Sequence, residues 1–548
     1  MAVCTVCSSS FIITEDDRAF YQTMDVSPPA LCPVCRFRRK AVWRNERTLY
    51  VRTCDLCAKT MVSMFPRESH FTVYCRDCYY SDRWDPLSYG MRYNAARTFF
   101  DQFHELHLKT PKSATLTSGQ SVNSEYQLWA GHNKDCYMVS NSGFNEMLLY
   151  SRGMRQCRDT IDCYYGVDTE LSYESINIHN SSRVRYSDNV RNCLDSWFLR
   201  DCTGCTNCFG CVNLRYKDYY FFNELLSKEE YERRVAEIVG SSERLQKMRE
   251  EFTQFSMTQP YRAHHNMKSE DCSGDYIVDS KNCHACYEVD KGENCSYHYF
   301  TKTAKDAYDC IGFGYDSELL YECVAVGFSH KVMGCMYVEQ CSDIEYCTSV
   351  RSSASCIGCD GVDKVQFAIL NTIYPEDEYR FMRQQIIDSM KREGSWGQYF
   401  PLKLAPFAFN ESIALDYYPL SKEEARGQGY RWQDELPETI GKETMLFSAL
   451  PDHIRDVPDT ITKEILACEA CKRNYKIIAQ ELRLYRQLSV PIPRLCFSCR
   501  HAARLARRGP MQLMARTCTK CGKAVQTSSS HDAAPILYCE ECYVAQVA

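Results

Sequence analysis

Sixteen of the chain's 35 cysteines follow one spacing pattern that occurs twice. The N-terminal set is Cys4, Cys7, Cys32, Cys35, Cys54, Cys57, Cys75 and Cys78. Every member of the C-terminal set lies 464 residues further on, without a gap: Cys468, Cys471, Cys496, Cys499, Cys518, Cys521, Cys539 and Cys542. Tyr21 and Arg36 also have identical partners at Tyr485 and Arg500. The chain therefore carries one module of four Cys-x₂-Cys pairs at each end.

Pairs of Cys-x₂-Cys turns are typical of zinc sites, because each turn presents two sulfur atoms to one tetrahedral ion. Four pairs per module predict four Cys₄ sites in total, each with all four positions filled by thiolates. Such closed sites are structural, since no position is left for water or substrate. We expect sequential pairing, in which neighbouring Cys-x₂-Cys pairs share an ion. A cross-braced module, in which the first pair joins the third, is the alternative.

The first half of each module carries a further signature. Cys4-x₂-Cys7 is followed by Phe20-Tyr21 and then by Cys32-Pro-Val-Cys35-Arg36, with a basic run that has helical spacing. This pattern resembles the bacterial probable zinc-ribbon domain family, a treble-clef-like module, over residues 4–40 and more loosely over 468–504. The whole layout, with Tyr399-Phe-Pro-Leu-Lys-Leu-Ala-Pro-Phe407, resembles large zinc-ribbon proteins of candidate-phyla bacteria. That resemblance implies no particular activity.

Composition limits the class of protein. The chain has 548 residues, 45% of them hydrophobic, and no apolar run of transmembrane length or signal-peptide pattern. A high cysteine count in such a chain favours metal binding in a reducing compartment, so we expect a cytoplasmic protein with no membrane partner. Residues 1–110 carry 15 Lys and Arg against 12 Asp and Glu, and residues 463–548 carry 14 against 6. With a total charge of −6, the middle is strongly acidic.

The middle is duplicated at an offset of 148 residues. The segment 168–174 matches 316–322, and the pair Cys208 and Cys211 matches Cys356 and Cys359. Short segments rich in Tyr, Val, Ile and Cys alternate with polar turns. The tyrosines at 287, 297 and 308 mark a spacing near 11 residues. We predict a mainly β protein built on a duplicated β-solenoid, with a right-handed parallel β-helix favoured. A β-sandwich or barrel is the alternative.

These observations predict six segments: a double zinc-ribbon module (1–110), a first solenoid unit (111–226), a helical connector (227–268), a second solenoid unit (269–374), a helix with an irregular linker (375–462) and a second double zinc-ribbon module (463–548). Ser227 with Glu230, and Ser421 with Glu424, are candidate helix capping boxes. Pro375 takes the place of Ser227 in the second copy. We therefore expect helical caps on both solenoid units, with one helix over about 228–255.

Nineteen cysteines lie outside the modules. The run Cys202, Cys205, Cys208 and Cys211 resembles a ferredoxin-type ligand set, but its last gap is two residues and Val212 follows instead of proline. The second copy keeps only Cys356 and Cys359. We favour interior or turn cysteines over an iron–sulfur cluster or an additional zinc ion, and the same choice applies to Cys272, Cys283 and Cys286.

No phosphate-binding loop, His-Glu-x₂-His motif or nucleophile elbow occurs in the sequence. Asp168, Glu174, Asp316 and Glu322 could line one face, but acidic residues of this kind are more often turn or rim residues. The pair His264-His265 is expected at the surface. We predict no enzyme and no catalytic residues.

The leading functional hypothesis is a zinc-binding scaffold that docks nucleic acid or a ribonucleoprotein through its basic ends. The candidate contacts follow the zinc ligands: Arg36, Arg38, Arg39, Lys40, Arg500, Arg504, Arg507 and Arg508. A solvated helix face, or contact with the acidic middle, is an equally good interpretation of these residues. The alternatives are a self-assembling structural protein, with a homodimer among its forms, and a redox or enzymatic protein that uses the solenoid cysteines.

Overall fold

The computed structural model describes residues 1–547. Strands account for 31% of the structure and helices for 26%, so the fold is mixed rather than mainly β. The prediction was too narrow because helices cover both modules, the connector and the segment after the second repeat. Among the described residues, no helix combines the length and apolar character needed to cross a bilayer.

The N-terminal module consists of two small β-hairpin units followed by a helix. Its elements are β1 (Ala2–Val3), β2 (Ser10–Phe11), α1 (Glu15–Thr23), α2 (Pro33–Ala41), β3 (Tyr50–Thr53), β4 (Thr60–Ser63), β5 (Val73–Tyr74), α3 (Arg76–Tyr79), η1 (Pro86–Tyr89) and α4 (Phe99–Lys109). The C-terminal module repeats the order with β35 (Leu466–Ala467), β36 (Asn474–Tyr475), α10 (Ala479–Leu488), α11 (Phe497–Arg508), β37 (Met514–Thr517), β38 (Ala524–Thr527), β39 (Leu537–Tyr538) and α12 (Glu540–Val547).

The first repeat forms a ladder of short parallel strands, which we call the first ladder. Successive turns pair at a separation of 12 residues, as in Tyr164 with Ile176 and Ile176 with Asp188. Before the ladder, β6 (Lys112–Ser113) pairs with β5 of the module. The ladder strands are β7 (Thr117–Ser118), β8 (Gln127–Leu128), β9 (Ala130–Gly131), β10 (Val139–Ser140), β11 (Glu146–Leu149), β12 (Arg152–Arg155), β13 (Arg158–Ile161), β14 (Tyr164–Val167), β15 (Ile176–His179), β16 (Ser182–Arg185), β17 (Asp188–Arg191), β18 (Leu194–Trp197), β19 (Tyr220–Phe221) and the antiparallel β20 (Glu224–Leu225).

A three-residue period inside the first ladder explains how the chain turns. From Gln156 to Tyr219, φ is positive at every third residue, and Asn, Asp and Gly hold many of these positions. As far as Cys211, the residue after each such turn faces inward and is small or aliphatic, so a narrow core of Cys, Ser, Thr, Val, Ile and Leu is buried. Asn and Asp tolerate the left-handed conformation better than other residues with a side chain.

The second repeat forms a parallel sheet of 13 strands, the second ladder. Its strands are β22 (Glu270–Val278), β23 (Lys281–Asp290), β24 (Glu293–Ser296), β25 (Tyr299–Lys302), β26 (Ala304–Phe313), β27 (Ser317–Gly327), β28 (His330–Met333), β29 (Met336–Glu339), β30 (Ser342–Glu345), β31 (Thr348–Arg351), β32 (Ala354–Ile357), β33 (Gln366–Ile369) and the antiparallel β34 (Thr372–Ile373). The separation is again 12 residues, with two exceptions: Glu270 pairs with Lys281, one position short, and Ala304 pairs with Ser317, one position further on.

Helices follow each ladder. The connector contains α5 (Lys228–Ile238), α6 (Ser242–Met257) and strand β21 (Tyr261–Arg262), so the single helix expected there is broken near Gly240, whose φ is +87°. Ser227 accepts a hydrogen bond from the Glu230 amide, and Ser421 forms the full capping box with Glu424. The last segment contains α7 (Glu376–Glu393), η2 (Leu402–Leu404), η3 (Phe409–Glu411), α8 (Ile413–Tyr417), α9 (Lys422–Gly427), η4 (Phe447–Ala449), η5 (Ile454–Asp456) and η6 (Asp459–Lys463).

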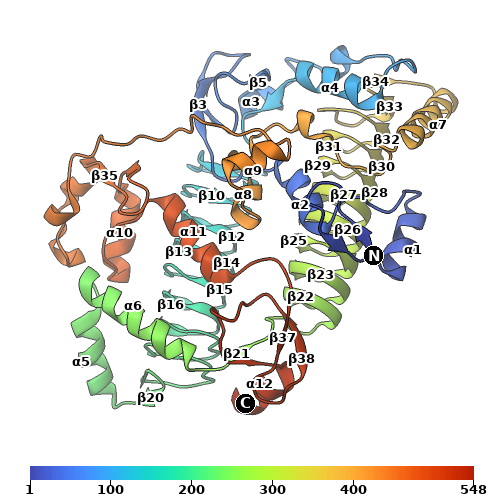
Figure 1. The fold of residues 1–548 in the computed structure, drawn as a ribbon. Coiled ribbons are helices and arrows are strands. Elements are labelled where there is room, and N and C mark those ends of the chain that lie inside the picture. The colour runs from blue at the N-terminus through green and yellow to red at the C-terminus, as the bar shows by residue number, and fades with distance from the viewer. Residues whose placement is uncertain (548) are drawn as a thin grey trace.

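The two ladders lie side by side, and the first half of each module lies on the ladder of the other half of the chain (Figure 1). Helix α2 contacts β26 and β27 of the second ladder, and α10 contacts β13 of the first ladder. Aromatic side chains fill both contacts: Phe20 stacks on Tyr308 with ring centres 3.9 Å apart, and Tyr485 meets Tyr173 edge-on at 5.8 Å. The chain therefore crosses over, so that its first and last segments dock on the repeat that is further away in sequence.

Candidate metal centres

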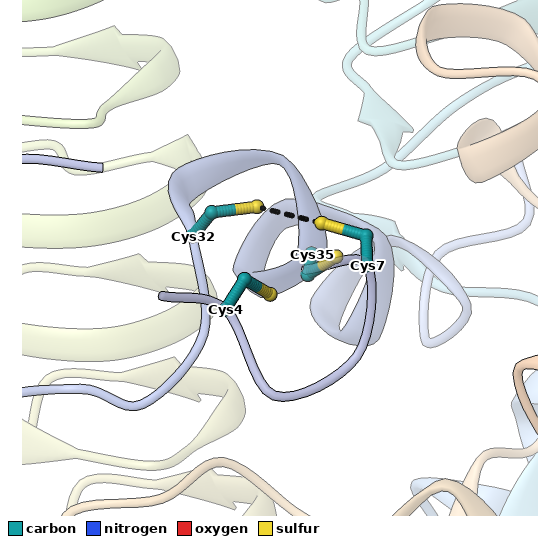
Figure 2. Close-up of side chains that lie close together, drawn as sticks. All are labelled: Cys4, Cys7, Cys32 and Cys35. Carbon is teal, nitrogen blue, oxygen red and sulfur yellow. Dashed lines mark hydrogen bonds between the residues drawn. The ribbon is translucent and has the colours of Figure 1, made fainter. Parts of the chain in front are cut away.

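The sixteen module cysteines come together in four groups of four. In each group the sulfur atoms all lie within 4.8 Å of one another, and the groups are Cys4, Cys7, Cys32 and Cys35; Cys54, Cys57, Cys75 and Cys78; Cys468, Cys471, Cys496 and Cys499; and Cys518, Cys521, Cys539 and Cys542. Figure 2 shows the first group, in which two Cys-x₂-Cys turns point their side chains at a common centre. The sequential pairing predicted from the spacing is the arrangement found.

The spacing of the sulfur atoms fits a tetrahedral ion. The Sγ atoms of Cys7 and Cys32 lie 3.6 Å apart, and those of Cys471 and Cys496 also lie 3.6 Å apart. In the second site of each module, the corresponding distances are 3.9 and 3.7 Å. Metal–sulfur bonds of about 2.3 Å in a tetrahedron place sulfur atoms roughly 3.8 Å apart. These four groups could each hold a metal ion.

The local backbone prepares each site for thiolate. The residue that follows the second cysteine of each site adopts a left-handed conformation, and these residues are Ser8, Ala58, Lys472 and Gly522. Backbone N–H groups of both turns point at sulfur: those of Leu56 and Cys57 come from the first turn, and that of Cys75, in the second turn, lies 3.2 Å from the Cys54 Sγ atom. Burial alone would raise the pKa of Cys54, but the N–H groups of Cys75, Cys57 and Leu56 lower it to about 7. The same balance lowers the pKa of Cys468 to about 7.

Helices α2, α11 and α3 each begin directly after a ligand, at Cys32, Cys496 and Cys75. The negative charge of the thiolates therefore lies at the positive end of a helix dipole. Since two turns and a helix end supply every ligand, the site fixes where the helix points. A metal ion bound at these groups would therefore orient α2 and α11, the helices that carry the basic residues.

The basic residues of α2 are ion-paired with the second ladder. The Arg36 Nε atom lies 2.7 Å from Asp309, and the Lys40 Nζ atom lies 2.7 Å from Glu322. Arg39 lies 3.2 Å from the same Glu322 carboxylate. The side chains of Arg36, Lys40, Asp309 and Glu322 are each at most 3% exposed. These charges are buried in the contact between module and ladder.

The basic residues of α11 are paired in the same way with the first ladder. Arg500 lies 2.8 Å from Asp162, and Arg504 bridges Asp162 and Glu174 at 2.9 and 2.8 Å. The remaining pairs are Arg507 with Glu174 (3.1 Å) and Asp188 (3.2 Å), and Arg508 with Glu288 of the second ladder (2.9 Å). Burial and the approach of Asp162 and Tyr485 act in opposite directions on Arg500, and the carboxylate neighbours raise its pKa.

The two contacts match residue by residue. Arg36 and Lys40 correspond to Arg500 and Arg504, and Glu322 corresponds to Glu174. The extra residue in the longer step between β26 and β27 makes Asp309 the counterpart of Asp162. A tyrosine hydroxyl donates to the acidic residue of the first module helix in both copies, from Tyr297 to Asp17 at 3.2 Å and from Tyr150 to Glu481 at 3.1 Å. The duplication therefore extends to the interface, although its two components lie far apart in sequence.

The structure changes the interpretation of the eight candidate nucleic-acid contacts. Arg36, Lys40, Arg500, Arg504 and Arg508 are buried, so their charges are not presented to a phosphate. Arg38 is half-buried and donates to the Tyr418 carbonyl at 3.0 Å, while Arg39 and Arg507 pair with Glu322 and Glu174. Of the two interpretations of the sequence, contact with the acidic middle is the one that the geometry supports, because complementary carboxylates face these residues.

The cysteines of the ladders have a different environment from those of the modules. Cys202, Cys205, Cys208 and Cys211 are the four inward positions of one turn of the first ladder and are all buried. Each thiol lies near the carbonyl oxygen two residues earlier, at 3.4 to 3.6 Å, as interior serines do at shorter range. Their sulfur atoms do not form a compact group of the kind seen in the modules within residues 1–547. The spacing that resembles a ferredoxin set is the period of the fold.

The second copy follows the same rule. Val350 and Ser353 stand where the first copy has Cys202 and Cys205, and both are buried inward positions. Cys283 and Cys286 are likewise buried, whereas Cys272 is half-buried at the start of the second ladder. Burial raises the pKa of such thiols, for example that of Cys341 to about 11. These cysteines act as small core residues.

The remaining candidates fall into two kinds. Glu174 and Glu322 belong to the module contacts, whereas Asp168 and Asp316 are exposed turn residues with positive φ. His265 was expected at the surface but is half-buried, 3.3 Å from Asp201 and 3.1 Å from Asp275. It therefore joins the end of the first ladder to the start of the second.

Comparison with known proteins adds no functional assignment: no family model and no curated protein matches this chain. The sequence prediction named Glu174 and Glu322 only as residues of a possible face, and it did not name Asp162 or Asp309 or pair any of the four with the basic helices. Their signal was present in the duplication, since Glu174 and Glu322 recur at the same place in both repeats. It could not be interpreted without knowing which module meets which ladder. The metal centres and their docking contacts are therefore the site from which a function can be argued.

Proposed function

We propose that this protein is a non-enzymatic zinc-dependent scaffold in which two β-solenoids are fastened side by side by two double zinc-ribbon modules. The observation that carries the proposal is the repeated ion-pair set between each basic module helix and the opposite ladder. In this view, zinc orders α2 and α11, and the ordered helices lock the ladders together.

Zinc is the metal best suited to these groups. Four cysteine ligands in a tetrahedron favour Zn²⁺ or an iron–sulfur centre over hard cations, and separate two-turn sites of this size suit a single zinc ion. Since thiolates fill every coordination position, the ion supplies folding energy rather than chemistry. The six segments predicted from the sequence are proposed as the building blocks of this scaffold, with no catalytic site among them.

The solenoid proposal rests on the strand register and the inward period. Paired residues lie 12 positions apart, and every third side chain points inward. These two observations fit a chain that winds around a narrow core once every 12 residues. We propose a right-handed winding, as in other parallel β connections. Such a rod is rigid and has a long flat side, which suits a scaffold.

Metal analysis combined with native mass spectrometry tests the proposal directly. We expect four zinc ions per chain and no visible absorption in the purified protein. Removal of zinc with a strong chelator should release both modules, so that limited proteolysis cuts residues 1–50 and 463–548 first while the ladders persist. A protein that contains iron, or one that keeps its protease resistance without metal, would overturn the proposal.

The module tips could still contact nucleic acid, and that part of the sequence hypothesis is kept as a second test. The same zinc-loaded protein is mixed with total cellular RNA and DNA in a gel-shift experiment at low and high salt. Arg504 is buried in an ion pair, whereas Arg507 is exposed. We therefore expect charge reversal at Arg507 to change the gel shift more than Arg504→Gln does, when both variants remain folded. Equal effects of the two variants would indicate that the whole of helix α11 binds nucleic acid.

A further inference from the structure

A cavity of about 710 Å³ lies between the two ladders, on strands that the zinc modules do not cover completely. The first ladder contributes Phe144, Arg155 and Tyr165 to its lining, and the second contributes Lys302, Phe328 and Glu339. The volume falls within the range of about 300–1,000 Å³ that is usual for sites of small organic ligands. We call this cavity the seam groove; the two ladders that line it are drawn in teal and in green-yellow in Figure 1.

Glycine residues in its lining leave the seam groove open. Gly143 and Gly327 line it from opposite ladders, and neither has a positive φ that would require glycine. A Cβ atom added to Gly327 would meet only the Cβ atom of Tyr315, at 3.9 Å, and one added to Gly143 would meet the Gly131 carbonyl at 3.2 Å. The backbone at Gly327 would therefore accept a larger residue. Glycine keeps the space open there.

The seam groove holds cations that lack counterions. Within residues 1–547, neither Arg155 nor Lys302 has a carboxylate oxygen within 4.0 Å, and the Nε atom of Arg155 is buried without a hydrogen-bond partner. Burial lowers the pKa of Lys302, and Asp290 opposes the shift while Arg155 adds to it. Unpaired charges that are partly removed from water are costly, and an anionic ligand would relieve that cost.

The positive charge continues along the first ladder. Arg155 and Arg191 occupy the same column of the parallel register, three turns apart. Strand spacing of about 4.8 Å places them roughly 14 Å from each other. His179 lies between them in the column, and burial together with Arg191 and Lys302 lowers its pKa to about 3, so it is neutral. A ligand that touches both arginines must carry more than one anionic group.

Aromatic rings flank these cations. Phe144 stacks on His132 with ring centres 4.6 Å apart, and Phe328 stacks on Tyr315 at 6.0 Å. Phe144 is 55% exposed and Phe328 is 49% exposed, which is unusual for rings of this size in an otherwise well-packed chain. The Arg155 guanidinium lies 5.5 Å from the centre of the Phe144 ring. Exposed rings next to unpaired cations form a surface on which bases stack and phosphates pair.

We propose that the seam groove binds phosphate-linked planar bases, as a short stretch of single-stranded nucleic acid. Arg155 and Lys302 in the groove receive phosphates, and Phe144 and Phe328 stack on bases. Arg191, which lies outside the groove three turns along the same column, receives a further phosphate of the strand. The carboxylates of the groove do not cancel this charge: Glu288 is already paired with Arg508 at 2.9 Å, and Glu339 is placed to accept from a base amino group. A free nucleotide has the same chemistry, so the test must separate the two sources.

The test uses the full-length, zinc-loaded protein and fluorescence anisotropy at 50 and 300 mM salt. The probes are labelled eight-residue oligo(U) and oligo(dT), with unlabelled AMP as competitor. We expect the oligonucleotides to bind at low salt and to weaken at least tenfold at high salt, because phosphate contacts release counterions. If AMP displaces the oligonucleotides at concentrations close to its own dissociation constant, the groove is a mononucleotide site and not a strand site. The proposed contacts with phosphate and base would still hold.

Two groove variants and a matched control make the test specific. Arg155→Gln with Lys302→Gln removes the unpaired charges, and Gly327→Leu fills the space without backbone strain. The control, Arg158→Gln with Lys305→Gln, changes the exposed basic residues three positions further along each chain segment. We expect a loss of at least tenfold in affinity for both groove variants and no change for the control, with zinc content and circular dichroism unaltered throughout. No binding at 50 mM salt, or binding that the groove variants leave intact, overturns the proposal while the zinc scaffold stands.

Discussion

The contact of the N-terminal module with the second ladder and the contact of the C-terminal module with the first ladder use the same plan with different residues. Lys40 takes the place of Arg504, Asp17 the place of Glu481, and Phe20 the place of Leu484. Charge sign and position are kept in the first two exchanges and apolar character in the third, whereas side-chain size differs in all three. The positions of opposite charges therefore specify how a module docks on a ladder. The identity of the side chains adjusts the strength of that contact.

The C-terminal contact is the richer of the two. Arg504 reaches two carboxylates, and Arg507 reaches Glu174 and Asp188, whereas Lys40 offers a single ammonium group to Glu322 with Asp309 at 3.8 Å. A guanidinium can share its donors among several oxygens, which a lysine does less well. We therefore expect the C-terminal module to be held more tightly. The following experiments test that asymmetry.

The largest effect is expected from the metal ligands. Cys35→Ser and Cys499→Ser each remove one ligand from the site that orients a basic helix, and structural zinc contributes roughly 10–16 kcal/mol in isolated zinc-finger peptides. Each variant should lose one zinc ion and release its own module, with the N-terminal module released more completely. Native mass spectrometry and limited proteolysis measure both results. Cys272→Ser, in the half-buried start of the second ladder, should keep all four ions.

The buried carboxylates come next. Glu322→Gln and Glu174→Gln each remove a buried carboxylate that two module cations share, and breaking a buried pair of this kind costs about 3–5 kcal/mol. Glu174→Gln should cost more, since Glu174 pairs with two arginines, whereas Glu322 pairs with Arg39 and the single ammonium group of Lys40. Urea unfolding followed by near-ultraviolet circular dichroism gives the values. Glu318→Gln, whose partner Lys305 is 3.8 Å away and exposed, should change stability by less than about 1 kcal/mol, and a larger loss there would mean that general charge balance matters more than these contacts.

A pH dependence is expected at the junction of the two ladders. Burial would lower the pKa of His265, but Asp275 and Asp201 raise it to about 9, compared with about 6.5 for the unfolded chain. The raised pKa stabilises the folded state by up to roughly 3 kcal/mol, in full below pH 6.5, and this contribution is lost as the pH rises toward 9. His265→Asn should flatten stability between pH 6.5 and 9. Unchanged curves for the variant would show that His265 does not hold the ladders together.

The smallest effect is expected inside the first ladder. Cys205→Ser installs the residue that the second ladder carries at Ser353, also a buried inward position. The hydroxyl can donate to the same carbonyl as the thiol, so the change should cost less than about 1 kcal/mol. Cys205→Leu should cost about 1–3 kcal/mol, because the narrow core has no room for two more carbon atoms. Thermal unfolding measures both, and a large loss with serine would point to a role of the thiol beyond packing.

The four cysteine groups and the helices that follow Cys32 and Cys496 could be predicted because their signals are local. The separation of 12 residues was missed because the tyrosines at 287, 297 and 308, which are spaced by about 11 residues, lie in different columns of the ladder: Tyr287 aligns with Tyr299, whereas Tyr308 aligns with Ser296. The inward residues carry the true period, and the run from Cys202 to Cys211 displays it directly. The break near Gly240 was likewise hidden by an unbroken charged pattern in the connector.

The docking contacts could not be predicted from spacing alone. Arg36 and Asp309 are 273 residues apart, and nothing local tells which of two similar ladders a module meets. The one-residue insertion between β26 and β27 also displaces Asp309 from the simple offset of 148 that relates the repeats. Sequence identifies the basic helix and the acidic body, and only the arrangement in space assigns the partners.

The crossed arrangement affects how the protein can be made. The first module leaves the ribosome long before its docking surface exists, since the 273 residues between Arg36 and Asp309 take roughly 15–55 s to synthesise at about 5–20 residues per second. Each ladder can form meanwhile, because its contacts join residues only 12 positions apart. A nascent chain must therefore keep a metal-loaded, basic module unattached until the second ladder emerges. The N-terminal module is therefore the first part of the chain to be synthesised, and its contact with the second ladder is among the last to form.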